Sequence, residues 1–246
     1  MRVIAIATGT LLVTMSNSGV VEAAANEAPY SSVVQSLAAN LVAVVSPPDV
    51  MRQNARHSAE TSIDQGLARD PNLPAAEIAY PGLSGAMKAA GMAAVEPLID
   101  NACQDLASRQ RDLFARSFTV SELRELIAFY SSPTAKQAAA AALAITRDPR
   151  DPVGTNDMKA KAGEGELTER DFSRLGNALA QTKVPPSVDQ ALQKFSTSGV
   201  YKKLNFFNPE LDKTMAQWLN DYTPKIQSAI RVSMTDKAAA YIAGHR

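Results

Sequence analysis

Apolar residues recur along this chain at the three- and four-residue spacing of amphipathic helices, whereas alternating apolar and polar runs bounded by tight turns are scarce. One such helix is expected up to residue 46, where Pro47-Pro48 ends it, because proline disfavours the α conformation in the residue before it. A second is expected over residues 49–67 with Asp49 as its N-cap. Residues 69–83 contain three prolines and a glycine and are expected to form a loop.

The next helix is expected over residues 84–116. Gly85 and Gly91 weaken its first half, and Pro97 is expected to kink it or to restart it. The last helix is expected to begin at Asn208-Pro209, as N-cap and first helical residue, and to bend or split at Pro224.

Residues 118–130 carry the most complete helix signal in the chain. Thr119 is the expected N-cap and Glu122, three residues later, completes a capping box. Phe118 and Leu123 are placed to form the hydrophobic staple that often accompanies it. Leu123, Leu126, Ile127 and Tyr130 then follow at helical spacing and predict a buried stripe. Ser132-Pro133 predicts the start of a further helix that contains Ala138 to Ala142.

Together these patterns predict an all-α bundle of about seven or eight helices. Residues 26–147 are expected to form a helical domain, and residues 148–166, rich in Asp, Pro, Gly and Lys, are expected to form a linker. Residues 167–246 form a C-terminal helical region that can pack with the first domain or separately. This region opens with a second start signal, Thr168 with Asp171 and Leu167 with Phe172, which is either a repeat or a common signal used twice.

Residues 1–25 have the features of a cleaved signal peptide. Arg2 supplies the positive charge, and residues 3–15 form an apolar run broken only by Thr and Gly. Ala23-Ala24-Ala25 offers the small residues that signal peptidase requires. The apolar run is shorter than the roughly 20 residues of a spanning helix. We therefore expect cleavage after Ala25, a periplasmic or secreted protein, and no transmembrane anchor in the mature chain.

Charge and cysteine content narrow the function classes. The chain has 25 Lys and Arg residues against 25 Asp and Glu residues, without the basic excess of a nucleic-acid-binding protein. Cys103 is the single cysteine, so no intramolecular disulfide can form and stability must come from packing. Its neighbours Leu98, Ile99, Ala102 and Leu106 indicate a small buried hydrophobe rather than a reactive thiol.

The segment around residues 118–133 resembles a bacterial envelope family, the one called domain of unknown function 2059. The resemblance rests on Phe118-Thr119, Glu122-Leu123, Phe129-Tyr130 and Ser132-Pro133, and it extends loosely over residues 33–145. Ala135 stands where the family pattern has glycine. The resemblance implies a secreted or periplasmic all-helical protein and supplies no catalytic residue.

Enzyme chemistry finds little support in the sequence. His57 lies three residues before Glu60 and seven before Asp64, which would share a helix face as metal ligands, but no second His or Cys pair completes a site. A solvated polar face is therefore the better interpretation. No Gly-x-Ser-x-Gly elbow and no phosphate-binding glycine pattern are present. We expect no enzyme activity, no metal site and no cofactor.

One segment suggests a binding surface. Tyr201, Lys202, Lys203, Phe206 and Phe207 cluster aromatic and basic side chains within one short stretch. As an exposed lip they would touch a partner protein, a lipid headgroup or a peptidoglycan fragment. As a plug, the apolar members would close the end of the bundle while the lysines reach water. We favour the plug, because large apolar side chains are usually buried.

The sequence alone therefore supports three functional hypotheses. The first is a non-enzymatic interaction or envelope-maintenance protein whose partner is another envelope protein. The second is a carrier of a lipid or apolar small molecule, with Met87, Met92, Met215 and Met234 lining a groove between helices, although methionines are more often core filler. The third is a cell-wall hydrolase, for which no paired acidic or nucleophilic residues can be assigned.

Overall fold

The fold of the protein is all-α in the computed structural model, which describes residues 5–7, 10–12, 31–146, 155–172, 174 and 186–245. These residues contain nine helices of seven residues or more, a short helical stretch at 169–172 and two three-residue strands. The elements are β1 (Ala5–Ala7), β2 (Thr10–Leu12), α1 (Ser32–Val45), α2 (Pro48–Arg69), α3 (Leu73–Ala79), α4 (Leu83–Ser117), α5 (Val120–Tyr130), α6 (Pro133–Thr146), α7 (Thr155–Glu164), α9 (Pro186–Ser196) and α10 (Gly199–Gly244).

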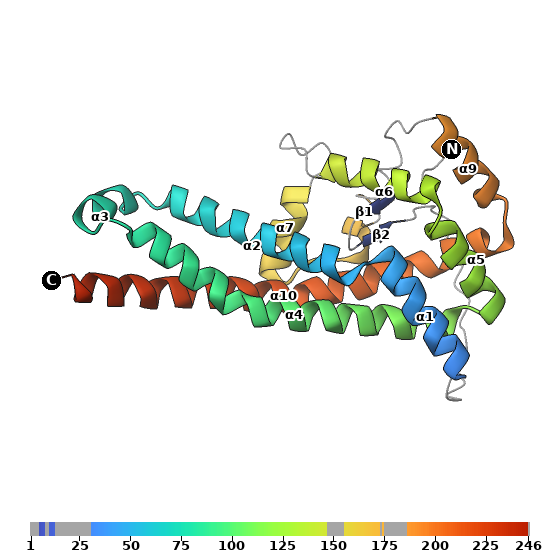
Figure 1. The fold of residues 1–246 in the computed structure, drawn as a ribbon, viewed down its shortest axis with the longest axis horizontal. Coiled ribbons are helices and arrows are strands. Elements are labelled where there is room, and N and C mark those ends of the chain that lie inside the picture. The colour runs from blue at the N-terminus through green and yellow to red at the C-terminus, as the bar shows by residue number, and fades with distance from the viewer. Residues whose placement is uncertain are drawn as a thin grey trace.

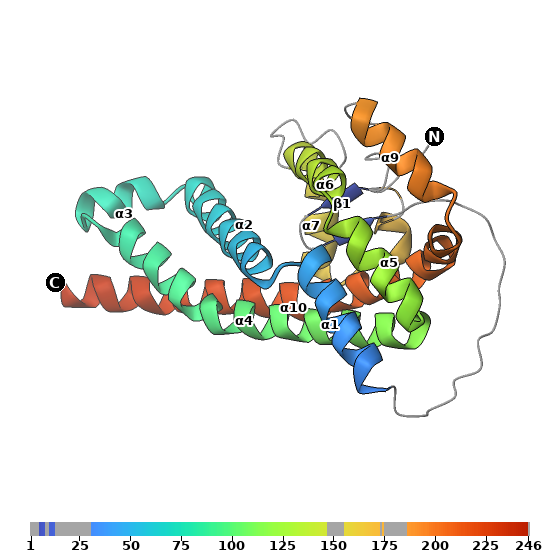
Figure 2. The same cartoon turned by 45° about the vertical axis from the view of Figure 1, so that its right-hand side comes forward.

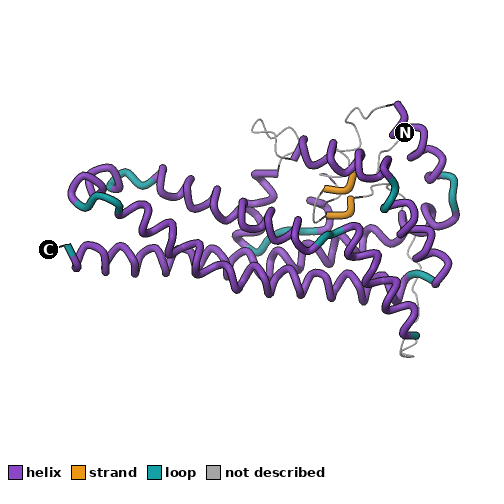
Figure 3. Tube along the Cα trace, viewed as in Figure 1, coloured by secondary structure: helices purple, strands orange, loops and turns teal. Residues whose placement is uncertain are grey.

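Two long helices, α4 and α10, lie side by side and run through most of the molecule (Figure 1). They are antiparallel, since Trp218 Nε1 donates to the Ala102 carbonyl at 2.8 Å and Ser233 Oγ donates to the Ala90 carbonyl at 2.9 Å. One end forms a head with α1, α5, α6, α7 and α9. At the other end α2 and α3 complete a projecting arm that also holds the C-terminus (Figures 1 and 2). The Cα trace shows that the arm is helical along most of its length (Figure 3).

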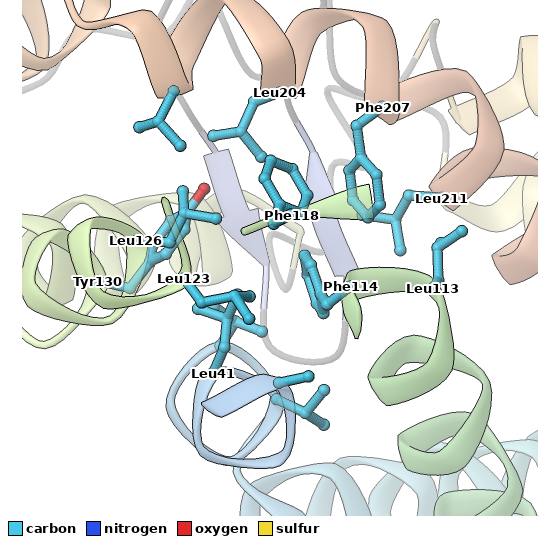
Figure 4. Close-up of a cluster of buried hydrophobic side chains, with 14 of the residues drawn as sticks. Leu41, Leu113, Phe114, Phe118, Leu123, Leu126, Tyr130, Leu204, Phe207 and Leu211 are labelled. Carbon is cyan, nitrogen blue, oxygen red and sulfur yellow. The ribbon is translucent and has the colours of Figure 1, made fainter. Parts of the chain in front are cut away.

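The larger buried cluster lies in the head and joins residues from α1, α4, α5, α6, α9 and α10 (Figure 4). Phe114, at the end of α4, stacks on Phe207 of α10 with ring centroids 5.0 Å apart, and Phe118 meets the same ring edge-on at 5.0 Å. Leu41 of α1 and Leu126 of α5 are fully buried in the same cluster. Residues 26–147 and 167–246 thus share this cluster.

A second buried cluster lies between α2, α4, α7 and α10. Val95, Ile99 and Leu106 are its most buried members on α4, and Met215 enters it from α10. Cys103 is also buried here, as expected, and desolvation raises the pKa of its thiol. Leu167 and Phe172 belong to it as well, so both residues predicted to form the second staple are buried in one cluster.

Several local expectations are confirmed by the structure. Thr119 Oγ1 accepts from the Glu122 amide and Glu122 Oε2 accepts from the Thr119 amide, which completes the capping box of α5. Phe118, Leu123, Leu126 and Tyr130 are buried. Ser132 Oγ accepts from the Ala135 amide at 3.2 Å as α6 begins at Pro133.

Pro209 was expected to be the first residue of the last helix, but it lies inside α10. α4 is continuous through Pro97, and α10 is continuous through Pro209 and Pro224, so Asn208 is not its N-cap. Ser198 caps α10 instead, with Oγ accepting from the Tyr201 amide at 3.1 Å. Pro97 and Pro209 both lie on exposed faces. Each ring therefore faces water, and the buried stripe on the opposite side continues past it.

Three boundaries were also predicted wrongly. Asp49 lies in the first turn of α2, whose N-cap is Pro47. The expected loop 69–83 contains α3, where Pro74 occupies the first turn, in which its missing N–H is not needed. The expected linker 148–166 contains α7, whose Ala162 is buried in the second cluster. Residues 147–154 lie outside the described residues.

The N-terminal strands were not expected from the sequence. β1 and β2 pair antiparallel, with Ala5 opposite Leu12 and Ala7 opposite Thr10. β1 lies beside α6, and β2 lies beside α10 (Figure 1). Both strands fall within the predicted signal peptide; the expected cleavage site after Ala25 lies outside the described residues. Among the described residues no single helix could cross a membrane, although α1 and α2, bent by 45° at their junction, pass by length and composition when taken together.

Candidate functional site

The predicted binding segment 201–207 is divided between core and surface. Tyr201, Leu204 and Phe207 are buried in the head cluster, so they are part of the plug rather than an exposed lip. Phe206, by contrast, is 67% exposed and Lys202 is exposed beside it. Phe206 and Phe207 are neighbours on α10, and one residue of a helix turns by about 100°, which separates their directions. The plug interpretation is therefore wrong for Phe206 alone.

Lys203 connects this segment to the family-like motif. Its Nζ lies 2.7 Å from Glu122 Oε2 and 5.2 Å from the centre of the Phe118 ring. Partial desolvation raises the pKa of Glu122, but hydrogen bonds from Lys203 and Thr119 outweigh it, so the pKa lies below its ordinary value. Glu122 thus serves both as the capping residue of α5 and as the anchor for α10.

The other motif residues complete the packing of the head. Phe129 stacks on Phe195 of α9 with ring centroids 3.7 Å apart, and Tyr130 is buried beside it. Burial raises the pKa of Tyr130, whose hydroxyl has no hydrogen-bond partner among the described residues. The structural motif predicted at residues 118–133 is therefore a packing and capping device, and none of these contacts assembles reactive groups.

A groove of about 800 Å³ lies between α2 and α4 and is open to solvent. His57 lines it with Arg56 and Glu60 from α2 and with Met92 and Glu96 from α4. Arg52 also lines the groove, and Arg52, Arg56 and Glu60 each form an ion pair with a side chain of α4. Within the described residues no group of three or more His, Cys, Asp or Glu side chains is placed to hold a metal ion.

A ladder of ion pairs joins α2 to α4 along the arm. Arg52 Nε lies 2.6 Å from Asp100 Oδ1, and Arg56 Nε lies 2.8 Å from Glu96 Oε1. Further along the arm the positive side chain comes from α4 instead of α2. Lys88 of α4 lies 3.0 Å from Glu60 and 2.8 Å from Asp64, both on α2. Hydrogen bonds to Asp64 and Glu60 raise the pKa of Lys88. Glu60 and Asp64, considered as metal ligands with His57, are therefore engaged by a lysine.

The far end of the arm carries a feature that the sequence reasoning missed. Ile78 on α3 is 84% exposed, the most exposed of the large apolar residues described, and none of the seven residues of α3 is buried. The helix contributes nothing to either buried cluster. Its apolar surface, formed by Pro74, Ala75, Ile78 and Ala79, faces outward and is here called the arm tip.

The arm tip is held by hydrogen bonds rather than by apolar packing. Both carboxylate oxygens of Glu77 accept backbone N–H groups, from Gly82 at 2.7 Å and from Ser84 at 2.8 Å, and so cap α4. These bonds hold the pKa of Glu77 below its ordinary value. Tyr241 near the end of α10 donates to the Pro81 carbonyl at 2.8 Å. Gly82 has φ of 90°, a left-handed conformation that favours glycine.

Residues 104–158 match the family described as an uncharacterized protein conserved in bacteria, DUF2059. This match confirms the resemblance suggested by the motif at residues 118–133, over a range that begins later than expected and ends beyond residue 145. Comparison with curated proteins and with solved structures gives no match. The family connection therefore supplies no reaction, ligand or partner.

Proposed function

We propose that this protein is a periplasmic or secreted bacterial protein that acts without catalysis, by binding another component of the cell envelope through the arm tip. The signal-peptide pattern of residues 1–25 and the match to a bacterial family support the location. The observation that carries the binding proposal is the exposed α3, which is ordered by hydrogen bonds and leaves its largest apolar side chain in water.

The geometry of the arm supports this role. α10 has 46 residues, which corresponds to about 69 Å of continuous helix, and α3 lies near its C-terminal end. The ion pairs of Arg52, Arg56 and Lys88 fasten α2 along the same arm. A partner at the arm tip would thus be held far from the head, by a surface whose apolar residues do not serve the fold.

Site-specific photocrosslinking tests this proposal. A photoreactive amino acid replaces Ile78 in one variant and Val232, which is 53% exposed on α10, in a matched control. We expect one discrete protein adduct in periplasm from position 78, absent from position 232 and lost when Ala75 and Ala79 are changed to Glu. Adducts of equal intensity and pattern from both positions would contradict the proposal.

Mass spectrometry of the purified mature protein separates the remaining hypotheses. Without an adduct at position 78, a stoichiometric co-purified lipid would favour the carrier hypothesis instead. Absence of both adduct and lipid would reopen the hydrolase hypothesis. N-terminal sequencing of the exported protein is a separate test of cleavage after Ala25.

A further inference from the structure

The surroundings of α6 depend on residues that the expected processing removes. β1 lies along α6, and the other elements most extensively beside this helix are α9 and the end of α5, from which α6 follows after a two-residue turn. β2 extends the same hairpin to α10. The cartoon shows the two strands between α6 and α10 in both views (Figures 1 and 2).

The composition of α6 suits close contact with an extended chain. Residues 138–142 are all alanine, and Ala135 and Ala138 are buried whereas Lys136 and Gln137 are exposed. Alanine side chains are short, so another backbone can approach the helix closely. The strands β1 and β2, residues 5–7 and 10–12, are uncharged and contain only Ala, Ile, Leu and Thr. This face therefore accommodates an uncharged, mostly apolar segment in the form of two paired strands.

We infer that cleavage after Ala25 uncovers this face of α6 and α10, and that in the mature protein it binds an uncharged apolar peptide segment of a partner protein in place of β1 and β2. The inference rests on the export and interaction role proposed above, and it adds a second contact at the head, distinct from the arm tip. In the precursor β1 and β2 of the same chain occupy the face. Binding is therefore coupled to maturation, because the competing segment is removed when the chain reaches its destination.

A peptide-binding experiment tests the inference. The probe is a fluorescein-labelled peptide of residues 3–15 with two added C-terminal lysines for solubility, and fluorescence anisotropy measures its binding to the mature chain 26–246. We expect saturable binding to the mature chain and at least ten-fold weaker binding to the full chain 1–246. A peptide with Ile6→Asp and Leu11→Asp should bind at least ten-fold more weakly than the probe. Equal binding of both peptides, or no binding, would overturn the inference.

Two variants of α6 provide a matched pair. Ala138→Trp enlarges a buried position and should weaken peptide binding at least ten-fold, whereas Gln137→Trp adds the same side chain at an exposed position and should leave it unchanged. Circular dichroism establishes that both variants remain folded. If Ala138→Trp does not fold, the comparison of mature and full chains still decides the question.

Competition with palmitate distinguishes the nature of the occupant. Failure of palmitate to displace the peptide supports a peptide-binding face. Binding of palmitate by a mature chain that does not bind the peptide would overturn the inference in favour of a lipid face. Because the arm-tip crosslink does not involve α6, its result is independent of this one. If sequencing shows an uncleaved N-terminus, the export proposal fails whatever the peptide does.

Discussion

Lys203 Nζ and Glu122 Oε2, separated by 81 residues in the sequence, lie 2.7 Å apart and join α10 to the capping box of α5. Both side chains are partly exposed, so we expect a modest coupling free energy of about 0.5–1 kcal/mol from a double-mutant cycle of Lys203→Met and Glu122→Gln. Glu122→Gln should cost more than Lys203→Met, because it also weakens the cap at Thr119. Urea unfolding of the four proteins measures both quantities. Strict additivity would contradict the coupling.

The same carboxylate predicts a pH dependence. The pKa of Glu122 in the folded protein lies below its unfolded value, so its ionised form stabilises the fold above the unfolded pKa of about 4.3. That contribution is lost as the pH falls through the lowered folded-state pKa. Asp171, whose pKa is also lowered, by Lys161 and Thr168 against the effect of desolvation, has the same sign. Thermal unfolding should show a smaller decrease in Tm between pH 5 and pH 3 for Glu122→Gln than for the wild type, by the same linkage argument.

Adjacent phenylalanines on α10 should differ sharply when truncated. Phe207 is 5% exposed within the head cluster, so Phe207→Ala should lower the free energy of unfolding by about 3–5 kcal/mol. Phe206→Ala should change it by less than about 0.5 kcal/mol, because its ring is in water. Chemical denaturation of each single variant checks both values. A large loss for Phe206→Ala would mean that its side chain packs against a part of the fold.

Leu126 tests the predicted stripe of α5. It is fully buried, and Leu126→Asp should unfold the protein by placing an unpaired charge in the head cluster. The exposed neighbour Glu125 provides the control, since Glu125→Asp should leave Tm within a few degrees of the wild type. Circular dichroism melting of both variants decides the matter. A cooperative wild-type melt for Leu126→Asp would show that α5 packs differently.

Two glycines of α4 should respond oppositely to alanine. A Cβ at Gly91 would lie 3.1 Å from Ile63 Cδ1 and 3.2 Å from Met234 Cγ, so Gly91→Ala should be neutral to destabilising despite its better helix propensity. Gly85 has no atom within 4 Å of such a Cβ, and Gly85→Ala should stabilise by about 0.5–1 kcal/mol. Differential scanning calorimetry measures both. Equal stabilisation by the two substitutions would show that α2 and α10 are not packed closely at Gly91.

The features predicted correctly are those that neighbouring residues specify. The capping box of Thr119 and Glu122, the burial of Phe118 and Leu123 and the cap at Ser132 each depend on side chains within five positions of one another. The buried thiol of Cys103 follows from an apolar stripe on one helix. Side chains close together in the sequence were sufficient to predict these caps and buried residues. The same short motif carries the family resemblance that the match over residues 104–158 confirms.

The errors arose where distant contacts decide the outcome. Pro209 was taken as a helix start, but Leu204, Phe207 and Leu211 form one buried stripe across it, and their burial outweighs one missing backbone hydrogen bond. The arm tip could not be foreseen, because its order depends on Tyr241 reaching Pro81 across 160 residues. Glu77, five residues before Gly82, was the one local signal that a cap for α4 lay upstream.

The length and position of α10 set when this chain can fold. Its residues 200–216 complete both buried clusters, and its last turns cap the arm through Tyr241. Until that C-terminal fifth of the chain is available, α1, α4 and α5 can pack only on one another, and the face of α4 that α10 covers stays exposed. Contacts of such long sequence separation form late. A chain that is still being synthesised therefore lacks the contacts that complete both buried clusters. The protein can complete its structure only after residues 200–241 are available.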